Sequence, residues 1–194
     1  MSAVAVVTVV PSQFTMVAFS ASEIAALSGS VADRVGLPAD LPIAVEVDET
    51  TPLGRTKLSS VSPAVVNVQS GAFENPKQLR SLSPRNVEDV LGRIFHRLLD
   101  RLSPAFADAP ADDALTLAQA TAWDTYAVGR CAQLGYEPQK QRRLYHFRNR
   151  HGFNDVADRV FERLWSAPAG SLTWADILAA CEETAAGRGE SPAA

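Results

Sequence analysis

The period of the hydrophobic residues changes at Ser83, within the stretch SPRNVEDVLGRIFHRLLDRL (residues 83–102). Ser83 is a favoured helix cap and Pro84 a favoured first helical residue, so a helix is expected to begin here. Apolar side chains then recur at the spacing of one helix face: Val87, Val90, Leu91, Ile94, Leu98 and Leu102. This pattern predicts a long amphipathic helix that packs one face into a core.

The residues that follow keep a helical period. Further helices are predicted near residues 115–135, 138–150, 154–165 and 173–186. Thr173 with Asp176 resembles a capping box at the start of the last one. The chain from residue 83 onward is therefore expected to be a helical part of four to five helices.

Strand patterns dominate the start of the chain. Residues 4–10 form a Val-rich run that Pro11 ends, and residues 14–19 predict a second short strand or its continuation. The pattern then becomes helical over residues 20–35, where Ser20 and a glutamate three residues later match a capping box. We expect one helix between the first strands and those that follow.

Two later segments alternate apolar and polar residues, namely 43–48 and 64–69. Such alternation is typical of strands with one buried face. Residues 55–60 follow a turn and are expected to pair back on residues 43–48 as a hairpin. Residues 71–82 are expected to be a loop.

These patterns together predict the α+β class. We expect a small mixed or antiparallel sheet of three to five strands with one helix, followed by the helical part packed on it. The halves, residues 3–82 and 83–186, are short enough to share one core, so a single domain is predicted over residues 1–186. Residues 187–194 are expected to be a flexible tail.

The composition is that of an ordinary globular protein. The 194 residues carry a net charge of −4, 46% are hydrophobic, and no apolar run approaches the length of a membrane span. The first cationic side chain is Arg34, so the apolar start lacks the basic region of a secretory signal. The two cysteines fit a reducing cytoplasm, and the abundance of Arg and Ala is typical of bacterial proteins.

Catalytic motifs are absent from the sequence. There is no glycine-rich phosphate loop, no Gly-x-Ser-x-Gly elbow and no Cys-x-x-Cys pair. Cys131 and Cys181 lie among apolar helical residues and are interpreted as small core residues. Glu46 and Asp48 point the same way from one predicted strand, and we interpret them as part of its solvated face. We therefore expect no cofactor and a non-enzymatic role.

His96 and Asp100 lie four residues apart on the helix predicted after Ser83. This spacing suits either two metal ligands or a pair that interacts on the helix surface. The surface pair is the simpler interpretation, and the metal site is the alternative.

The order of strand, helix, two strands, His-bearing helix and second long helix resembles that of the zincin metallopeptidases. Zincins carry His-Glu-x-x-His on the first of these late helices, where this chain reads HRLLD (residues 96–100), with Arg97 in place of the general base. The resemblance covers about residues 15–135 and implies a degenerate zincin-like metallopeptidase fold that lacks the motif. Its third ligand would come from Asp113 or Asp124.

The most distinctive segment is KQRRLYHFRNRHGF (residues 140–153), which holds five cations and no acid. Arginines beside aromatic rings can bind phosphates and stack on bases, and arginine also binds carboxylates in a bidentate way. The simplest alternative is a helix whose arginines pair with Asp155, Asp158 and Glu162. The candidate ligand-binding residues are Arg130, Arg142, Arg143, Tyr145, His146, Arg148 and Arg150.

The leading interpretation is a cytoplasmic protein that binds another protein or itself, with no membrane association and no nucleic-acid partner. The first alternative is an anionic-ligand or nucleic-acid binder that uses residues 140–153. The second is the degenerate zincin-like fold.

Overall fold

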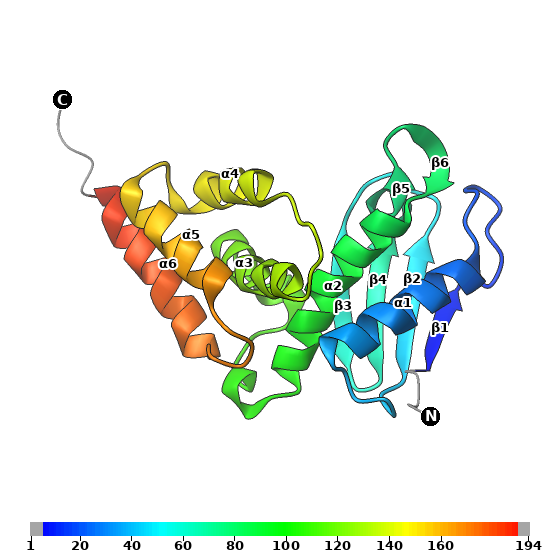
Figure 1. Ribbon diagram of the computed structural model, residues 1–194, viewed down its shortest axis with the longest axis horizontal. Coiled ribbons are helices and arrows are strands. Elements are labelled where there is room, and N and C mark those ends of the chain that lie inside the picture. The colour runs from blue at the N-terminus through cyan, green and yellow to red at the C-terminus, as the bar shows by residue number, and fades with distance from the viewer. Residues whose placement is uncertain (1–5, 190–194) are drawn as a thin grey trace. The chain divides into compact units, whose positions relative to one another are not determined.

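The computed structural model describes residues 6–189 (Figure 1). The chain forms two compact units, Met1–Leu99 and Asp100–Ala194. The boundary falls near the end of helix α2 (Pro84–Arg101), about 17 residues beyond the change in period in the sequence. A core shared by both parts of the chain stays a prediction. The first unit is a mixed sheet with helices and the second is helical, which confirms the α+β class.

The first unit contains a four-stranded sheet in the order β1-β2-β4-β3. Its strands are β1 (Val7–Val10), β2 (Ile43–Asp48), β3 (Thr56–Val61) and β4 (Ala64–Gln69). β1, β2 and β4 run parallel, and β3 is antiparallel to β4. The expected hairpin of residues 55–60 with 43–48 is therefore wrong in its partner, because both edges of β2 are already occupied by parallel strands.

One face of this sheet is buried. Val45 and Val66 are fully buried, whereas Glu46, the next residue along β2, is exposed. Figure 1 draws α1 (Ala21–Val35) and α2 in front of the same side of the sheet. Their apolar stripes include Ile24 and Leu91, which are also fully buried. The predicted amphipathic helix after Ser83 is thus confirmed as a core helix.

The helix boundaries follow the expected capping chemistry. The Ser20 side chain accepts a hydrogen bond from the Glu23 N–H at 3.2 Å at the start of α1. The Ser83 hydroxyl accepts from the Asn86 N–H at 3.2 Å at the start of α2. Gly36 ends α1 with φ of 83°, a left-handed conformation that glycine adopts without strain.

Two segments of this unit differ from expectation. Residues 71–82 are not a plain loop, because they include the short antiparallel strands β5 (Glu74–Asn75) and β6 (Gln78–Leu82) after the 3-10 helix η1 (Ser70–Ala72). Residues 14–19 form no strand beyond one bridge. The N–H groups of Thr15 and Met16 instead donate to the Glu49 carboxylate, at 2.8 and 2.6 Å, so they are unavailable to a ladder.

The second unit contains four helices after the end of α2: α3 (Leu117–Gln133), α4 (Lys140–His151), α5 (Asp155–Ser166) and α6 (Trp174–Gly189). Short 3-10 turns η2 (Pro104–Phe106) and η3 (Asp112–Ala114) precede them. All four predicted helices are confirmed. α6 continues three residues beyond residue 186, and the rest of the expected tail lies outside the described residues.

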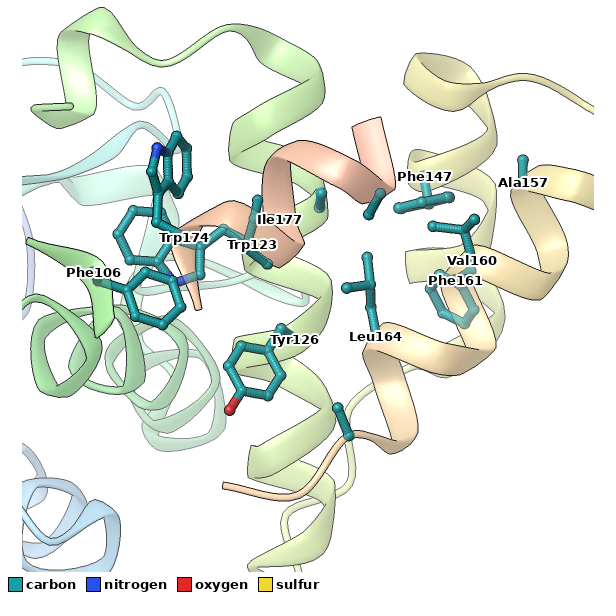
Figure 2. Close-up of a cluster of buried hydrophobic side chains, with 13 residues drawn as sticks. Phe106, Trp123, Tyr126, Phe147, Ala157, Val160, Phe161, Leu164, Trp174 and Ile177 are labelled. Atoms are coloured by element: carbon teal, nitrogen blue, oxygen red, sulfur yellow. The ribbon is translucent and has the colours of Figure 1, made fainter. Parts of the chain in front are cut away.

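The core of this unit is rich in aromatic side chains (Figure 2). Phe106 stacks on Trp123 with ring centroids 5.0 Å apart, and Trp174 lies 5.4 Å from Trp123. α3 and α5 approach each other closely, since a Cβ on Gly129 would lie 2.1 Å from the Trp165 carbonyl oxygen. Any larger residue at position 129 would push these helices apart.

Candidate recognition face on helix α4

One side of α4 anchors it to the second unit. The Phe147 ring is fully buried, stacks on the His151 ring at 3.9 Å and meets Phe161 of α5 edge-to-face at 5.6 Å. Leu144 packs against the same cluster. These positions are three and four residues apart, as the sequence pattern predicted.

His151 is a neutral structural group. Its Nε2 lies 3.1 Å from the Ala118 carbonyl oxygen, which can only accept, so Nε2 carries the hydrogen. Its Nδ1 lies 2.8 Å from the Thr184 hydroxyl. Burial, together with the charge of Arg188, lowers the His151 pKa to about 4 despite the opposing bond to Ala118. The imidazole therefore joins α4 to α3 and α6 without a charge at neutral pH.

Two of the segment's cations are held by α5. Arg148 donates to both oxygens of Asp158, at 2.7 and 2.5 Å, and Lys140 pairs with Glu162 at 2.7 Å. The hydrogen bond from Arg148 lowers the pKa of Asp158 and raises that of Arg148. The expected arginine pairing is thus confirmed for Asp158, whereas Glu162 pairs with a lysine instead of an arginine. Arg148, a candidate ligand residue, already has a carboxylate partner within the protein.

The opposite side of α4 carries exposed polar and aromatic side chains. We call this surface the α4 outer face: Arg142, Tyr145, His146, Asn149, Arg150 and, just beyond the helix, Phe153. Along α4 its members are spaced three, four, seven and eight residues from the first, which places them within about 140° of one another. Tyr145 is 58% exposed and Phe153 64% exposed. Single exposed apolar side chains are common, but adjacent ones form a patch of the kind that marks interaction sites.

The aromatic rings of the outer face lie together. The Tyr145 ring meets Phe153 edge-to-face at 6.0 Å and His146 at 6.2 Å. Gly152 has φ of 112° and ends α4, so the chain turns before Phe153. The turn brings Phe153 beside the helix instead of carrying it along the axis.

The electrostatic environment of the face is positive. Partial burial and the charges of Arg142, Arg143 and Arg150 lower the pKa of His146. No acidic residue occurs between residues 140 and 153 to offset those charges. The face itself therefore carries cationic side chains and no acidic one, on a protein with an overall charge of −4.

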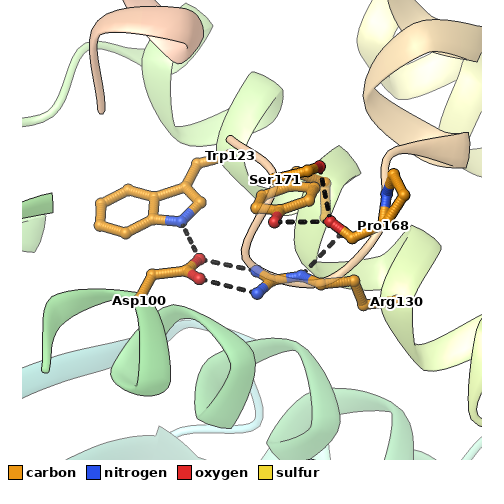
Figure 3. A network of polar contacts seen from close by, with 6 residues as sticks. Asp100, Trp123, Arg130, Pro168 and Ser171 are labelled. Atoms are coloured by element: carbon orange, nitrogen blue, oxygen red, sulfur yellow. Dashed lines mark hydrogen bonds and ion pairs between the residues drawn. The ribbon is translucent and has the colours of Figure 1, made fainter. Parts of the chain in front are cut away.

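Arg130 has a different environment from the other candidates, as Figure 3 shows. It is 2% exposed and donates to both oxygens of Asp100, at 2.7 and 2.6 Å. The Trp123 indole N–H donates to the same carboxylate at 2.7 Å, and the Arg130 guanidinium lies 3.8 Å from the centre of the Tyr126 ring. Arg130 is thus a structural cation, and we leave it out of the candidate site.

The same contacts bear on the metal hypothesis. Both carboxylate oxygens of Asp100 are used by Arg130 and Trp123, although His96 does lie on the same helix, α2. Among residues 6–189, no group of three or more His, Cys, Asp or Glu side chains is arranged to hold a metal ion. The Asp100 position suits a guanidinium better than a metal.

The cysteines and the carboxylates of β2 were the other groups considered for covalent or acid–base chemistry. Cys131 and Cys181 are not joined in a disulfide, and burial, with the nearby Glu182, raises the pKa of Cys181 to about 11. Glu46 accepts a hydrogen bond from Asn67 at 2.6 Å, and Asp48 accepts from the N–H and hydroxyl of Thr50. The hydrogen bonds from Thr50 lower the pKa of Asp48, so the shifts of Cys181 and Asp48 are opposite to those of a reactive thiol and of a carboxyl general acid.

Comparisons with protein-family models, with curated proteins and with solved structures found no match. The α4 outer face is therefore interpreted from its own geometry. In the part of the chain that the structure describes, no helix combines the length and apolar character needed to cross a bilayer.

Proposed function

We propose that the chain is a non-enzymatic binding protein whose α4 outer face docks on an acidic surface of a partner protein. The observation that carries the proposal is the exposed Tyr145–Phe153 pair flanked by Arg142 and Arg150, with no acid in the segment. Aromatic residues and arginine are enriched where protein interfaces derive most of their binding energy, and Asp and Glu are depleted there.

The base of α4 supports this role. The buried side chains of Phe147 and His151 anchor α4 to the second unit, and the Arg148–Asp158 pair joins it to α5. A face held in this way loses little conformational entropy when a partner binds. The positive potential of the face would speed encounter with an acidic partner and disfavour basic ones.

The exposed rings also favour a second candidate, single-stranded nucleic acid. Bases stack on exposed aromatic side chains, and arginines neutralise the adjacent phosphates. Two arginines on the outer face are few for a phosphate-tracking groove, and the whole chain is acidic. We therefore rank the protein partner first.

A photo-reactive amino acid at Asn149, between the two arginines, tests the proposal in living cells. We expect a cross-linked protein that disappears in Arg142→Glu/Arg150→Glu and persists in Arg159→Glu, which changes an exposed arginine of α5. Cross-links to nucleic acid that weaken steeply as salt is raised would instead favour the second candidate. Cross-links that are unaffected by Arg142→Glu/Arg150→Glu would overturn both candidate functions.

The same proposal includes a cytoplasmic location in a bacterium. The absence of a disulfide at Cys131 and Cys181 supports a reducing compartment, and the Arg- and Ala-rich composition supports the bacterial origin. Binding of this kind needs no cofactor.

A further inference from the structure

The edge of the sheet formed by β1 differs from the edge formed by β3. Natural proteins protect exposed strand edges with charged side chains or with bulges. β3 has both, since it carries Lys57 and its register with β4 shifts between Leu58 and Ser60. β1 reads VTVV, with neither a charge nor a shift in its register with β2.

The backbone direction of β1 follows from its pairing. The Ile43 N–H donates to the Val6 carbonyl at 3.1 Å, and Ile43 is level with Val7. In a parallel ladder this means that the N–H and C=O groups of residues 6, 8 and 10 point toward β2. Those of Val7 and Val9 point away from it, to the side where the described strands place no neighbour.

The side chains of the same strand expose apolar surface. Val7 and Val9 share the buried side of the sheet with Ile43 and Val45, their partners in register. The alternate residues lie on the open side, where Val6 is 67% exposed and Val10 is 53% exposed. Backbone groups without a strand partner thus coincide with exposed valine side chains.

We propose that β1 pairs antiparallel with β1 of a second copy of this chain, with Thr8 opposite Thr8 of the second copy. This register places Val7 opposite Val9 and Val6 opposite Val10 of the second copy. All opposed pairs except the central Thr8 pair therefore join two valines. Opposed residues of an antiparallel pair point to the same face. The buried sides of the two sheets therefore lie on one side of a continuous eight-stranded sheet.

The hydrogen bonds agree with this register. Val7 lies opposite Val9 of the second copy, and Val9 lies opposite Val7 of the second copy. The N–H and C=O groups of these residues all point into the new interface. Each such pair exchanges two hydrogen bonds, as a hydrogen-bonded pair of an antiparallel ladder does. A register displaced by one residue would place Val7 opposite Thr8, whose N–H and C=O groups point toward β2, so the two residues could not exchange hydrogen bonds. The two-fold arrangement centred on Thr8 is self-complementary and pairs all five residues from Val6 to Val10 without reaching Pro11.

The interface is small. A pair of five-residue strands buries less than the standard protein–protein interface, so we expect a weak dimer that forms at high protein concentration. This dimer is independent of the α4 outer face, and it does not rest on the function proposed for that face.

Charge-exchanged variants of the full chain test the pairing by sedimentation equilibrium over micromolar to millimolar concentrations. We expect the wild type to pass from a mass of 20.8 kDa to twice that value. Val6→Lys/Val10→Lys and Val6→Glu/Val10→Glu should each stay monomeric, because like charges then lie opposite each other. Mixed in equal amounts they should form a heterodimer, because each Lys then lies opposite a Glu.

Leu79→Lys is the matched control, since Leu79 is 84% exposed on β6 and lies outside β1. It should dimerise like the wild type. A monomeric wild type at every concentration, or a wild-type dimer that survives the lysine pair, would overturn the proposal. A mixture that stays monomeric would overturn the antiparallel register.

Hydrogen exchange of the wild type provides a second measurement that does not depend on the variants. The amides of Val7 and Val9 should exchange about tenfold more slowly, or slower still, in concentrated than in dilute samples. The Thr8 amide, which points toward β2, should change much less. Equal concentration dependence at all three amides would contradict the pairing.

Discussion

Replacing Arg130 by Met is expected to destabilise the second unit strongly. Arg130 and Asp100 are 2% and 5% exposed, and two short hydrogen bonds join them. Removal of the guanidinium leaves a buried carboxylate that still accepts a hydrogen bond from the Trp123 indole at 2.7 Å but has lost its positive partner. Breaking a buried ion pair from one side costs about 3–5 kcal/mol. The lost contact of the guanidinium with the Tyr126 ring adds to this cost.

Urea denaturation followed by tryptophan fluorescence measures this loss in the appropriate part of the chain. All three tryptophans, Trp123, Trp165 and Trp174, belong to the second unit, so their emission reports on that unit alone. With a slope of about 2 kcal/mol per molar urea, the midpoint should fall by about 2 M.

The double variant Asp100→Leu/Arg130→Met provides the decisive comparison. It leaves no buried charge, so it should lose less free energy of unfolding than Arg130→Met alone, even though the Trp123 N–H loses its acceptor. The reasoning is refuted if Arg130→Met costs under about 1 kcal/mol, or if the double variant loses the sum of the two single losses.

Four further outcomes are expected. The folded-state pKa of His151 is about 4 against 6.5 in the unfolded chain, so stability is full above pH 6.5 and falls as pH drops toward 4. The fall is at most about 3 kcal/mol and should shrink in His151→Gln, which acid titration of the tryptophan signal checks. Arg148→Gln should lower the thermal midpoint because Asp158 loses its partner, whereas Arg150→Gln should leave it unchanged; equal midpoints would contradict the division of α4 into two faces. Leu91→Ala should cost about 2–5 kcal/mol in urea denaturation followed by circular dichroism, and a loss below about 1 kcal/mol would mean that Leu91 is not a core residue. EDTA should leave the thermal midpoint unchanged, and a clear drop would indicate a structural metal.

The local structure was predictable wherever it depended on neighbouring residues. Ser83, Pro84 and the apolar spacing of α2 specify a helix from their own order in the chain, and the structure begins α2 at Pro84. Strand pairing was not predictable in the same way. Residues 55–60 carry a strand pattern, but nothing within them selects between β2 and β4 as the partner.

The prediction of a strand in the irregular segment after β1 was wrong for a related reason. Residues 14–19 contain aromatic and β-branched side chains that favour a strand. Glu49 overrides that preference by accepting the N–H groups of Thr15 and Met16, and backbone hydrogen bonding to it holds its pKa below the ordinary value. A carboxylate more than 30 residues away in sequence gives no local sign of this role.

In the candidate site, too, ion pairs between residues close in sequence were predictable, whereas pairs between distant residues were not. Asp158 lies ten residues from Arg148, across the short turn that joins α4 to α5, so their pairing could be expected from the order of two adjacent helices. Asp100 lies 30 residues from Arg130, and in the sequence it is only the second member of a His–Asp spacing. Identical residue types at an identical spacing can bind a metal or a guanidinium, and the choice is made by whichever cation the fold brings to the carboxylate. In this protein that cation is Arg130. The arginines exposed on α4, Arg142 and Arg150, are those to which the fold brings no acidic partner among residues 6–189.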